Sequence, residues 1–244
     1  MRTYRTEAVV LHTWKLGEAD RIISLFTREY GKVRAVAKGV RRSGSKFGAR
    51  LELFSHVDVQ LVEGRGSLDT ITQVESLHPP MLGSDYDRFC AAQVLVEAAD
   101  RIVSEDRSPS LSQYRLLLGA LIALGRGQLP AMAVVDSYLL RALAAAGWAT
   151  TVQACVSCGD TEDLRWFSPQ LGGAVCPTCR AQGSASASPE LLALIGALLA
   201  GDWDHVCAVA PNLRSRAHGI VGAFAGWHLD RSLRSLPFLE GSAL

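Results

Sequence analysis

Residues 7–39 read EAVVLHTWKLGEADRIISLFTREYGKVRAVAKG, and their alternating pattern predicts three short β-strands separated by turns. The first strand is expected at Glu7–Trp14 and the second at Arg21–Thr27, which is rich in β-branched and aromatic residues. A turn at Tyr30-Gly31 leads into the third, Lys32–Lys38, where basic residues alternate with small apolar ones. This alternation predicts a strand with one buried face and one cationic face.

Two further strands complete a small β domain in the first 80 residues. Apolar residues at alternate positions predict strands at His56–Glu63 and Leu68–Val74, joined by a hairpin turn at Gly64-Arg65-Gly66. Five short strands within about 75 residues fit a sandwich or a small barrel. We predict a five-stranded OB-type barrel, a fold that binds oligonucleotides, and the pattern leaves an SH3-like barrel open as the alternative.

The segment from Gly31 to Arg50 is strongly basic. It contains no Asp or Glu and carries seven cations, which are the predicted DNA contacts: Lys32, Arg34, Lys38, Arg41, Arg42, Lys46 and Arg50. Each cation that pairs with a phosphate releases a condensed counterion, so a cationic strand that continues into a flexible loop at Gly39–Gly48 suits a polyanion. If all seven engage single-stranded DNA, log affinity should fall with log salt at a slope of about −5. The alternative is a solvated strand face and a disordered loop.

The charge of the whole chain supports an N-terminal location for this site. The net charge of the 244 residues is only +1. The first 80 residues hold 13 Lys/Arg against 9 Asp/Glu, a balance of +4, and the remainder hold 12 against 15, a balance of −3. Anion affinity is therefore expected in the N-terminal third. Tyr30 and Phe47 lie in or beside the basic segment, where each either stacks on unpaired bases or belongs to the core.

The region after His78-Pro79-Pro80 changes to helical periodicity, so the predicted domains are 1–80 for the barrel and 81–244 for an all-α domain. Helices are expected at about 84–105, 108–125, 131–146, 188–200, 202–210 and 212–235. Ser188-Pro189-Glu190 is the strongest start signal among them, because it combines a cap, a first-turn proline and a favourable acid. Three glycines weaken the last helix unless they permit close helix contact.

Four cysteines interrupt the helical region in two C-x-x-C pairs. Cys155 and Cys158 are followed after 17 residues by Cys176 and Cys179. Two tight turns of this kind place four thiolates around one tetrahedral metal, which predicts one structural Zn²⁺ in an inserted lobe at 150–183. With four protein ligands no position remains open for catalysis. The alternative is two redox-active or merely buried pairs, and Cys90 and Cys207 are expected in the helical core.

Enzyme motifs are absent from the sequence. It has no H-E-x-x-H, and the H-x-E and P-C-x-x-C combination of the zinc deaminases is not present. The loop Gly39–Lys46 has Ser and Lys in the reverse order to a phosphate-binding loop, and no helical pattern follows it. Because the N-terminus lacks an apolar signal and no apolar run reaches about 20 residues, we expect a cytoplasmic location. The predicted DNA binding makes this location nucleoid-associated.

Several N-terminal stretches resemble the RecO family of bacterial recombination mediators. They are Glu7–Leu11, Gly17–Ile22, Leu25–Lys32 and Ala37–Arg42, and the C-terminal Trp227-His228-Leu229 and Leu233–Ser235 are similar as well. The resemblance implies an OB-fold followed by a helical domain with a zinc lobe. It also implies a protein without a catalytic centre that binds single- and double-stranded DNA, anneals complementary strands and, with RecR, helps load RecA onto DNA covered by single-strand-binding protein.

Two rival functions are weighed against this one, and the second holds only if the metal is not bound by all four cysteines. A zinc-ribbon protein-interaction module in transcription or translation would use the lobe and helices without direct DNA binding. A zinc hydrolase would need an open coordination position, which four cysteine ligands exclude.

Overall fold

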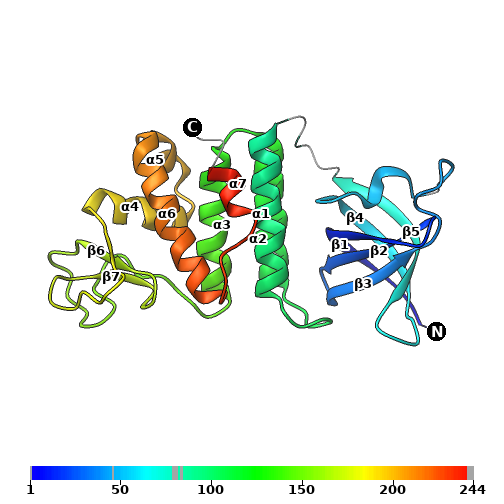
Figure 1. Ribbon diagram of the computed structural model, residues 1–244, viewed down its shortest axis with the longest axis horizontal. Helices are drawn as coiled ribbons and strands as arrows, with labels where there is room; N and C mark the ends of the chain where they lie inside the picture. The colour runs from blue at the N-terminus through cyan, green and yellow to red at the C-terminus, as the bar shows by residue number, and fades with distance from the viewer. Residues whose placement is uncertain (1, 46, 79–81, 83–84, 241–244) are drawn as a thin grey trace. The chain divides into compact units, whose positions relative to one another are not determined.

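The computed structural model describes residues 2–45, 47–78, 82 and 85–240, and it divides into two compact units (Figure 1). The barrel unit comprises Met1–Ser84 and Ala99–Gly125, and the helical unit comprises Asp85–Ala98 and Arg126–Leu244. The predicted division at residue 80 stays a prediction, since Pro79 and Pro80 lie outside the described residues.

Five strands form the predicted closed barrel. They are β1 (Thr3–Leu16), β2 (Asp20–Thr27), β3 (Gly31–Ala37), β4 (His56–Val62) and β5 (Asp69–His78), in the spatial order β1-β2-β3-β5-β4. Pairing of β1 with β4 closes the barrel, and all pairs are antiparallel except β3–β5. The expected alternation is confirmed in β3, where Val33, Ala35 and Ala37 are buried. The barrel fold is thus as predicted.

Two parts of the barrel differ from the sequence-based expectation. β1 is longer than predicted because its first half pairs with β4 and its second half with β2. The basic loop ends in a short 3₁₀ helix, Gly48–Leu51, which buries Phe47 and Leu51 in the barrel core. The segment after β3 is therefore anchored at its far end by apolar packing.

The segment 99–125 of the barrel unit completes the wall beside β3. It contains the end of α1 (Tyr86–Ile102) and nearly all of α2 (Leu111–Arg126). β3 pairs with β5 at only two positions, and Asp106 forms an isolated bridge with Lys32 in the space that remains. Gly31 has a φ of +66°, and a Cβ there would lie 2.2 Å from the Ser108 carbonyl oxygen. Only glycine fits this close approach.

The described residues of the helical unit form five further helices. They are α3 (Ala131–Ala145), α4 (Pro189–Ala200), α5 (Trp203–Ala208), α6 (Pro211–His228) and α7 (Leu236–Glu240). α3 packs against α4 and α6, which also contact each other. The start of α4 is as predicted, since Ser188 Oγ accepts a hydrogen bond from the Leu191 backbone N–H. None of the helices in the described ranges is both long and apolar enough to cross a bilayer.

The predicted final helix at about 212–235 begins within one residue of the prediction but is wrong at its end. α6 begins at Pro211 with Ala210 as its cap, and it ends at His228 because Asp230 adopts a left-handed conformation with a φ of 57°. The chain then turns back into α7, which approaches α6 closely: a Cβ on Gly222 would lie 3.0 Å from a Leu236 methyl group. The alternative role proposed for the glycines, close helix contact, is the correct one at this position.

The cysteine lobe lies in the chain between α3 and α4. It contains the strands β6 (Trp166–Ser168), β7 (Gly173–Val175) and β8 (Ala185–Ser186), in the order β7-β6-β8. Gly172, with a φ of +74°, lies in the turn between β6 and β7. Outside the lobe, Cys90 is buried as predicted, whereas Cys207 is exposed, so its assignment to the core is wrong.

Candidate nucleic-acid interface and metal site

Two of the seven predicted DNA contacts are already paired within the barrel unit. The ammonium nitrogen of Lys32 lies 2.9 Å from Asp100 Oδ1 and 3.1 Å from the Asp100 carbonyl oxygen, and its side chain is only 12% exposed. Arg34 Nη2 lies 3.0 Å from Asp106 Oδ2. Both carboxylates belong to the segment that completes the barrel wall beside β3. These two cations therefore hold that segment, and a phosphate would have to compete with a carboxylate for each.

Three other predicted contacts gather where β3 ends. Arg41 Nη1 donates to the carbonyl oxygens of Gly17, at 3.2 Å, and Glu18, at 2.8 Å, and its guanidinium stays exposed. These bonds fasten the turn after β3 onto the turn between β1 and β2. The side chains of Lys38 and Arg42 are exposed and make no ion pair within the described part of the chain. This end of the barrel therefore carries three exposed cations, beside which the Asp20 carboxylate accepts a hydrogen bond from the Gly39 backbone N–H at 2.7 Å.

The other two predicted DNA contacts follow the turn after β3 in the chain. Arg50 lies exposed at the 3₁₀ helix, and Lys46 lies outside the described residues. Of the two aromatic candidates for base stacking, Phe47 is 1% exposed and belongs to the core. Tyr30 is half-buried, with its ring centroid 4.6 Å from that of Tyr4. Phe47 is thus excluded as a stacking residue.

Two features of this surface were missed by sequence reasoning. The partners of Lys32 and Arg34 lie about 70 residues later in the chain, and no local pattern connects them; their only signal is the acidic cluster around residues 100–106. The second feature is Trp14, whose side chain is 47% exposed on β1. Its position in an alternating strand does show that it faces away from the core, because its neighbour Thr13 pairs with the buried Ile23.

A buried carboxylate links three parts of the barrel unit. Asp69, which is fully buried, accepts hydrogen bonds from the Tyr4 hydroxyl, the Gly64 backbone N–H and Arg107 Nη2, the last at 2.8 Å. Burial and the bond to Asp69 raise the pKa of Tyr4. The network closes the hairpin between β4 and β5 and holds Arg107 to the barrel. Its role is therefore structural.

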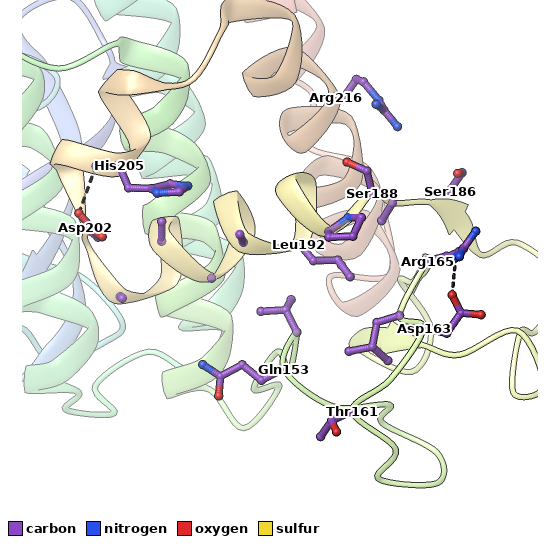
Figure 2. A pocket seen from close by; sticks show the side chains of 18 residues that line it. Gln153, Thr161, Asp163, Arg165, Ser186, Ser188, Leu192, Asp202, His205 and Arg216 are labelled. Atoms are coloured by element: carbon purple, nitrogen blue, oxygen red, sulfur yellow. Dashed lines mark hydrogen bonds and ion pairs between the residues drawn. The ribbon is translucent and has the colours of Figure 1, made fainter.

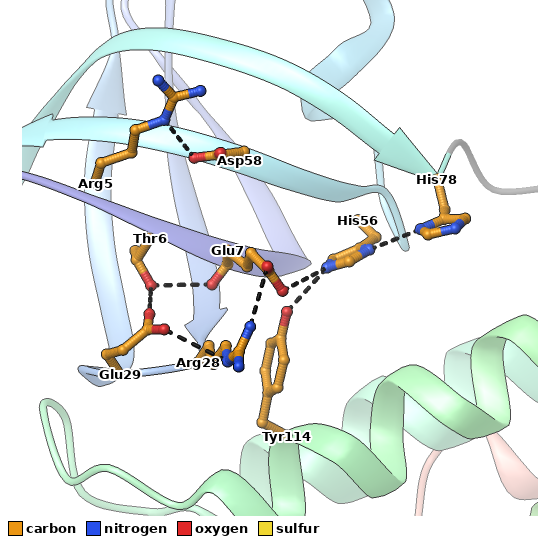
Figure 3. Close-up of polar contacts among 9 residues, drawn as sticks. All are labelled: Arg5, Thr6, Glu7, Arg28, Glu29, His56, Asp58, His78 and Tyr114. Carbon is orange, nitrogen blue, oxygen red and sulfur yellow. Dashed lines mark hydrogen bonds and ion pairs between the residues drawn. The ribbon is translucent and has the colours of Figure 1, made fainter.

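A second polar network joins α2 to the barrel (Figure 3). His56 Nε2 lies 2.9 Å from the Tyr114 hydroxyl, and His56 Nδ1 lies 3.0 Å from His78 Nδ1. Burial lowers the pKa of His56, although the Glu7 carboxylate 3.8 Å away acts in the opposite direction. A neutral His56 can donate to one neighbour and accept from the other, so the network is satisfied without a buried positive charge.

The four predicted metal ligands come together. All four sulfurs lie within 4.8 Å of one another, and Cys158 Sγ and Cys176 Sγ are 3.8 Å apart. A tetrahedron of Zn–S bonds of about 2.3 Å would place its sulfurs about 3.8 Å apart. The backbone N–H of Gly159 donates to the Cys155 carbonyl oxygen, and that of Cys179 to the Cys176 carbonyl oxygen, which closes each C-x-x-C turn. The donor set and its spacing fit a four-thiolate metal site.

The thiols of the cluster differ in acidity. Burial tends to raise the pKa of Cys155, but the backbone N–H groups of Cys176, Cys158 and Ser157 outweigh it and lower that pKa to about 6. Hydrogen bonds with the sulfurs of Cys158 and Cys176 raise the pKa of Cys179 to about 12. A divalent cation bound by the four sulfurs would displace the thiol protons.

A groove of about 1020 Å³ lies beside α4 in the helical unit (Figure 2). It is lined by the small residues Ala193 and Gly196 of α4 and by the exposed Asp163–Arg165 ion pair. None of the predicted DNA or metal ligands lines it.

Comparison with known families decides between the interpretations of the sequence. Residues 1–80 match the family model described as Recombination protein O N terminal, and residues 83–237 match the one described as Recombination protein O C terminal. The chain belongs to the RecO family. Relatives named DNA repair protein RecO from a Nocardioides species, Cutibacterium acnes and Thermobifida fusca are 54%, 52% and 47% identical to it. The alignments cover 97–98% of this chain and 99–100% of the relatives.

RecO membership confirms the resemblance that the N-terminal motifs indicated. The chain is a DNA repair and recombination protein of a non-enzymatic family, which agrees with the prediction that it is not an enzyme. A hydrolase built around the cysteine cluster is therefore excluded. Within a RecO protein, the basic end of the barrel and the four-cysteine cluster are the two sites whose roles need to be assigned.

Proposed function

We propose that this RecO-family chain binds single- and double-stranded DNA, anneals complementary strands and, with RecR, helps load RecA onto DNA covered by single-strand-binding protein. The observation that carries the DNA-binding part is the group of exposed cations at one end of a barrel of oligonucleotide-binding type. Lys38 and Arg42 have no carboxylate partner among the described residues, so their charge is available to phosphates.

The proposed mechanism of annealing is electrostatic. Two complementary strands repel each other through their phosphates, and cations that neutralise both lower this repulsion. The turn carrying Arg41 and Arg42 is fastened to the β1–β2 turn by hydrogen bonds from the backbone and side chain of Arg41, so the backbone that presents both cations is held to the barrel. Phosphate contacts carry no sequence information, which suits a protein that must anneal any sequence.

The two internal ion pairs reduce the number of residues that we propose as DNA contacts. Lys32 and Arg34 stabilise the barrel unit through Asp100 and Asp106, which leaves five of the predicted cations as the proposed DNA contacts: Lys38, Arg41, Arg42, Lys46 and Arg50. On single-stranded DNA this set corresponds to a slope of about −3.5 in log affinity against log salt, instead of about −5 for seven.

The test is a DNA-binding titration at several salt concentrations. Lys38→Ala/Arg41→Ala/Arg42→Ala should bind more weakly to every sequence, and its slope should be shallower by about 2. The matched control is Arg115→Ala/Arg141→Ala/Arg216→Ala, which removes the same charge from exposed positions on α2, α3 and α6. A slope near zero for the unaltered protein, or equal losses in the two triple variants, would refute the proposed surface.

A second arm tests the annealing and mediator parts. Complementary oligonucleotides covered with single-strand-binding protein should anneal faster when the protein is added, and RecA filaments should form faster when RecR is also present. A protein-interaction module of transcription or translation would instead show no DNA shift even at low salt.

We propose further that Cys155, Cys158, Cys176 and Cys179 hold one Zn²⁺ with a structural role. The lobe has a small core of its own, which consists of Cys155, Val175, Cys176 and a few partly buried side chains. The chemistry a bound ion supplies is four metal–thiolate bonds that substitute for the missing core, worth on the order of 10 kcal/mol.

A further inference from the structure

The outer surface of β1, β2 and β3 consists of rows of side chains that run across the three strands. One row is His12, Ser24 and Arg34, and the next is Trp14, Ile22 and Val36, as the strand pairing places these residues directly opposite one another. The intervening residues, such as Ile23 and Ala35, point into the core. This outer surface is the one that OB-type barrels offer to oligonucleotides.

The first row is covered by the segment 99–125 of the same unit. Ser24 is 2% exposed, Arg34 pairs with Asp106, and His12 Nε2 lies 3.8 Å from Asp100 Oδ2. Phe26, further along β2, is buried and has the ring of Tyr114 against it at a centroid distance of 5.9 Å. A strand of nucleic acid therefore has no access to this half of the surface.

The second row is open. Trp14 is 47% exposed and Leu16 is 39% exposed, and Ile22 and Val36 are only partly buried. The ring of His12, at a centroid distance of 5.5 Å, is the one aromatic neighbour of Trp14 among the described residues. A large indole is thus left facing solvent on an otherwise well-packed barrel, although its burial would be favourable by a few kcal/mol.

The cations border this open half. Lys38 follows directly after β3, and the Arg41 turn is bonded to the β1–β2 turn that begins just after Leu16. An aromatic face beside a band of positive charge is the combination by which single-stranded nucleic acids are held, because bases stack on the ring while phosphates meet the cations.

We propose that Trp14 is a base-stacking residue for single-stranded nucleic acid, on an open platform formed by Trp14, Ile22 and Val36. The proposal rests on the DNA-binding function proposed above and adds to it a contact to the bases. Phosphates bind at Lys38, Arg41 and Arg42, and an unpaired base lies on the indole. A base in duplex DNA is already stacked, so the contact favours single strands.

The experiment compares two single-stranded probes of equal length, oligo(dT) and an abasic oligonucleotide with the same number of phosphates. Trp14→Ala should weaken oligo(dT) binding by roughly 5- to 100-fold, and Trp14→Phe should recover most of that loss, because a benzene ring also stacks. The abasic probe should bind equally to all three proteins. The control is Trp227→Ala, which removes an indole that is 55% exposed on α6 and should leave both probes unaffected.

A spectroscopic readout accompanies the titration. Stacking of a base on Trp14 should quench part of the tryptophan emission when oligo(dT) is added, and this part should disappear in Trp14→Phe. Equal losses on both probes in Trp14→Ala would overturn the inference, since they would mean a disturbed barrel.

The outcomes also separate this inference from the function on which it rests. If the unaltered protein binds oligo(dT) and Trp14→Ala binds it equally well, only the stacking role is overturned. If the unaltered protein binds neither probe, both proposals are overturned. If Trp14→Ala keeps its DNA affinity but loses binding to RecR or to single-strand-binding protein, the platform is a protein-binding surface and the inference is wrong.

Discussion

Asp69 shows how one residue can hold a barrel together from a buried position. Its carboxylate accepts three hydrogen bonds, from a strand at the N-terminus, from the β4–β5 hairpin and from the segment after α1. Sequence periodicity placed Asp69 on the same strand face as Ile71, and both are buried. Alternation alone did not show that this face is buried, because the burial of Asp69 and its three partners depend on contacts between residues far apart in the chain.

We expect Asp69→Asn to destabilise the protein by about 2–3 kcal/mol, because the buried donors around it lose a charged acceptor. Urea unfolding measures the effect. The control is Asp58→Asn, which breaks the exposed ion pair with Arg5 and should cost less than about 1 kcal/mol. Similar costs for the two variants would contradict the role assigned to Asp69.

His56 gives the barrel unit a pH dependence whose sign follows from its burial. The folded state holds its pKa below the unfolded value of about 6.5, so the unfolded chain binds the proton first as the pH falls. Stability due to His56 is complete above about pH 6.5 and is lost below it, until the pH falls through the folded pKa.

The prediction is measured as the difference in unfolding free energy between the unaltered protein and His56→Gln. This difference should be constant above about pH 7 and shrink below about 6.5, at no more than about 1.4 kcal/mol per pH unit, since one proton is involved. Burial also lowers the pKa of His228, but that residue is present in both proteins and cancels. A difference that stays constant down to about pH 5 would disprove the assignment.

At the scale of elements, the cysteine lobe is the part whose folding depends most on a ligand. Its three strands are two or three residues long, and its buried core is formed in part by Cys155 and Cys176 themselves. Elements this short do not stabilise themselves, so we expect the lobe to unfold when its metal is removed while the barrel unit stays folded.

Chelation should release one zinc per chain and change the emission of Trp166, whose ring lies 3.5 Å from the Arg180 guanidinium carbon in the lobe. A thiol reagent should then label four more cysteines than before, while buried Cys90 stays protected and exposed Cys207 reacts in both states. Lowering the pH should release the metal as well, because the thiolates must be protonated. Unchanged Trp166 emission and labelling after chelation would contradict a folding role for the metal.

Helices and strands were predictable where a local signal fixes them. The start of α4 follows from Ser188 and Pro189, and its end follows from Gly201 in a left-handed conformation. The end of α6 was not predictable, because the chain turns at Asp230, a residue without a glycine's freedom. The distant Glu97 carboxylate holds the turn that follows by accepting hydrogen bonds from the backbone of Arg234 and Ser235.

For the whole molecule, the sequence predicted the barrel, the helical remainder and the four-cysteine cluster, since each has a periodic or spaced pattern. It did not predict which cations are available. A count of charges in the sequence gives Lys32 and Lys38 equal weight as DNA contacts. This is correct only where no acidic side chain from a distant part of the chain forms an ion pair with one of them. Asp100 pairs with Lys32, and Asp106 pairs with Arg34. The salt dependence of DNA binding therefore distinguishes the seven-cation surface from the five-cation one.

The short contact between β3 and β5 has a consequence for synthesis of the chain. The last strand ends at His78, but the residues that complete the wall, Asp106 and Arg107, leave the ribosome about 30 residues later. At typical elongation rates this is a delay of roughly 2 to 6 s. During this delay the gap between β3 and β5 stays open in the nascent barrel, with Lys32 lacking the Asp100 carboxylate and Asp69 lacking the Arg107 guanidinium. The barrel unit therefore finishes folding only when a segment encoded after its five strands has been made.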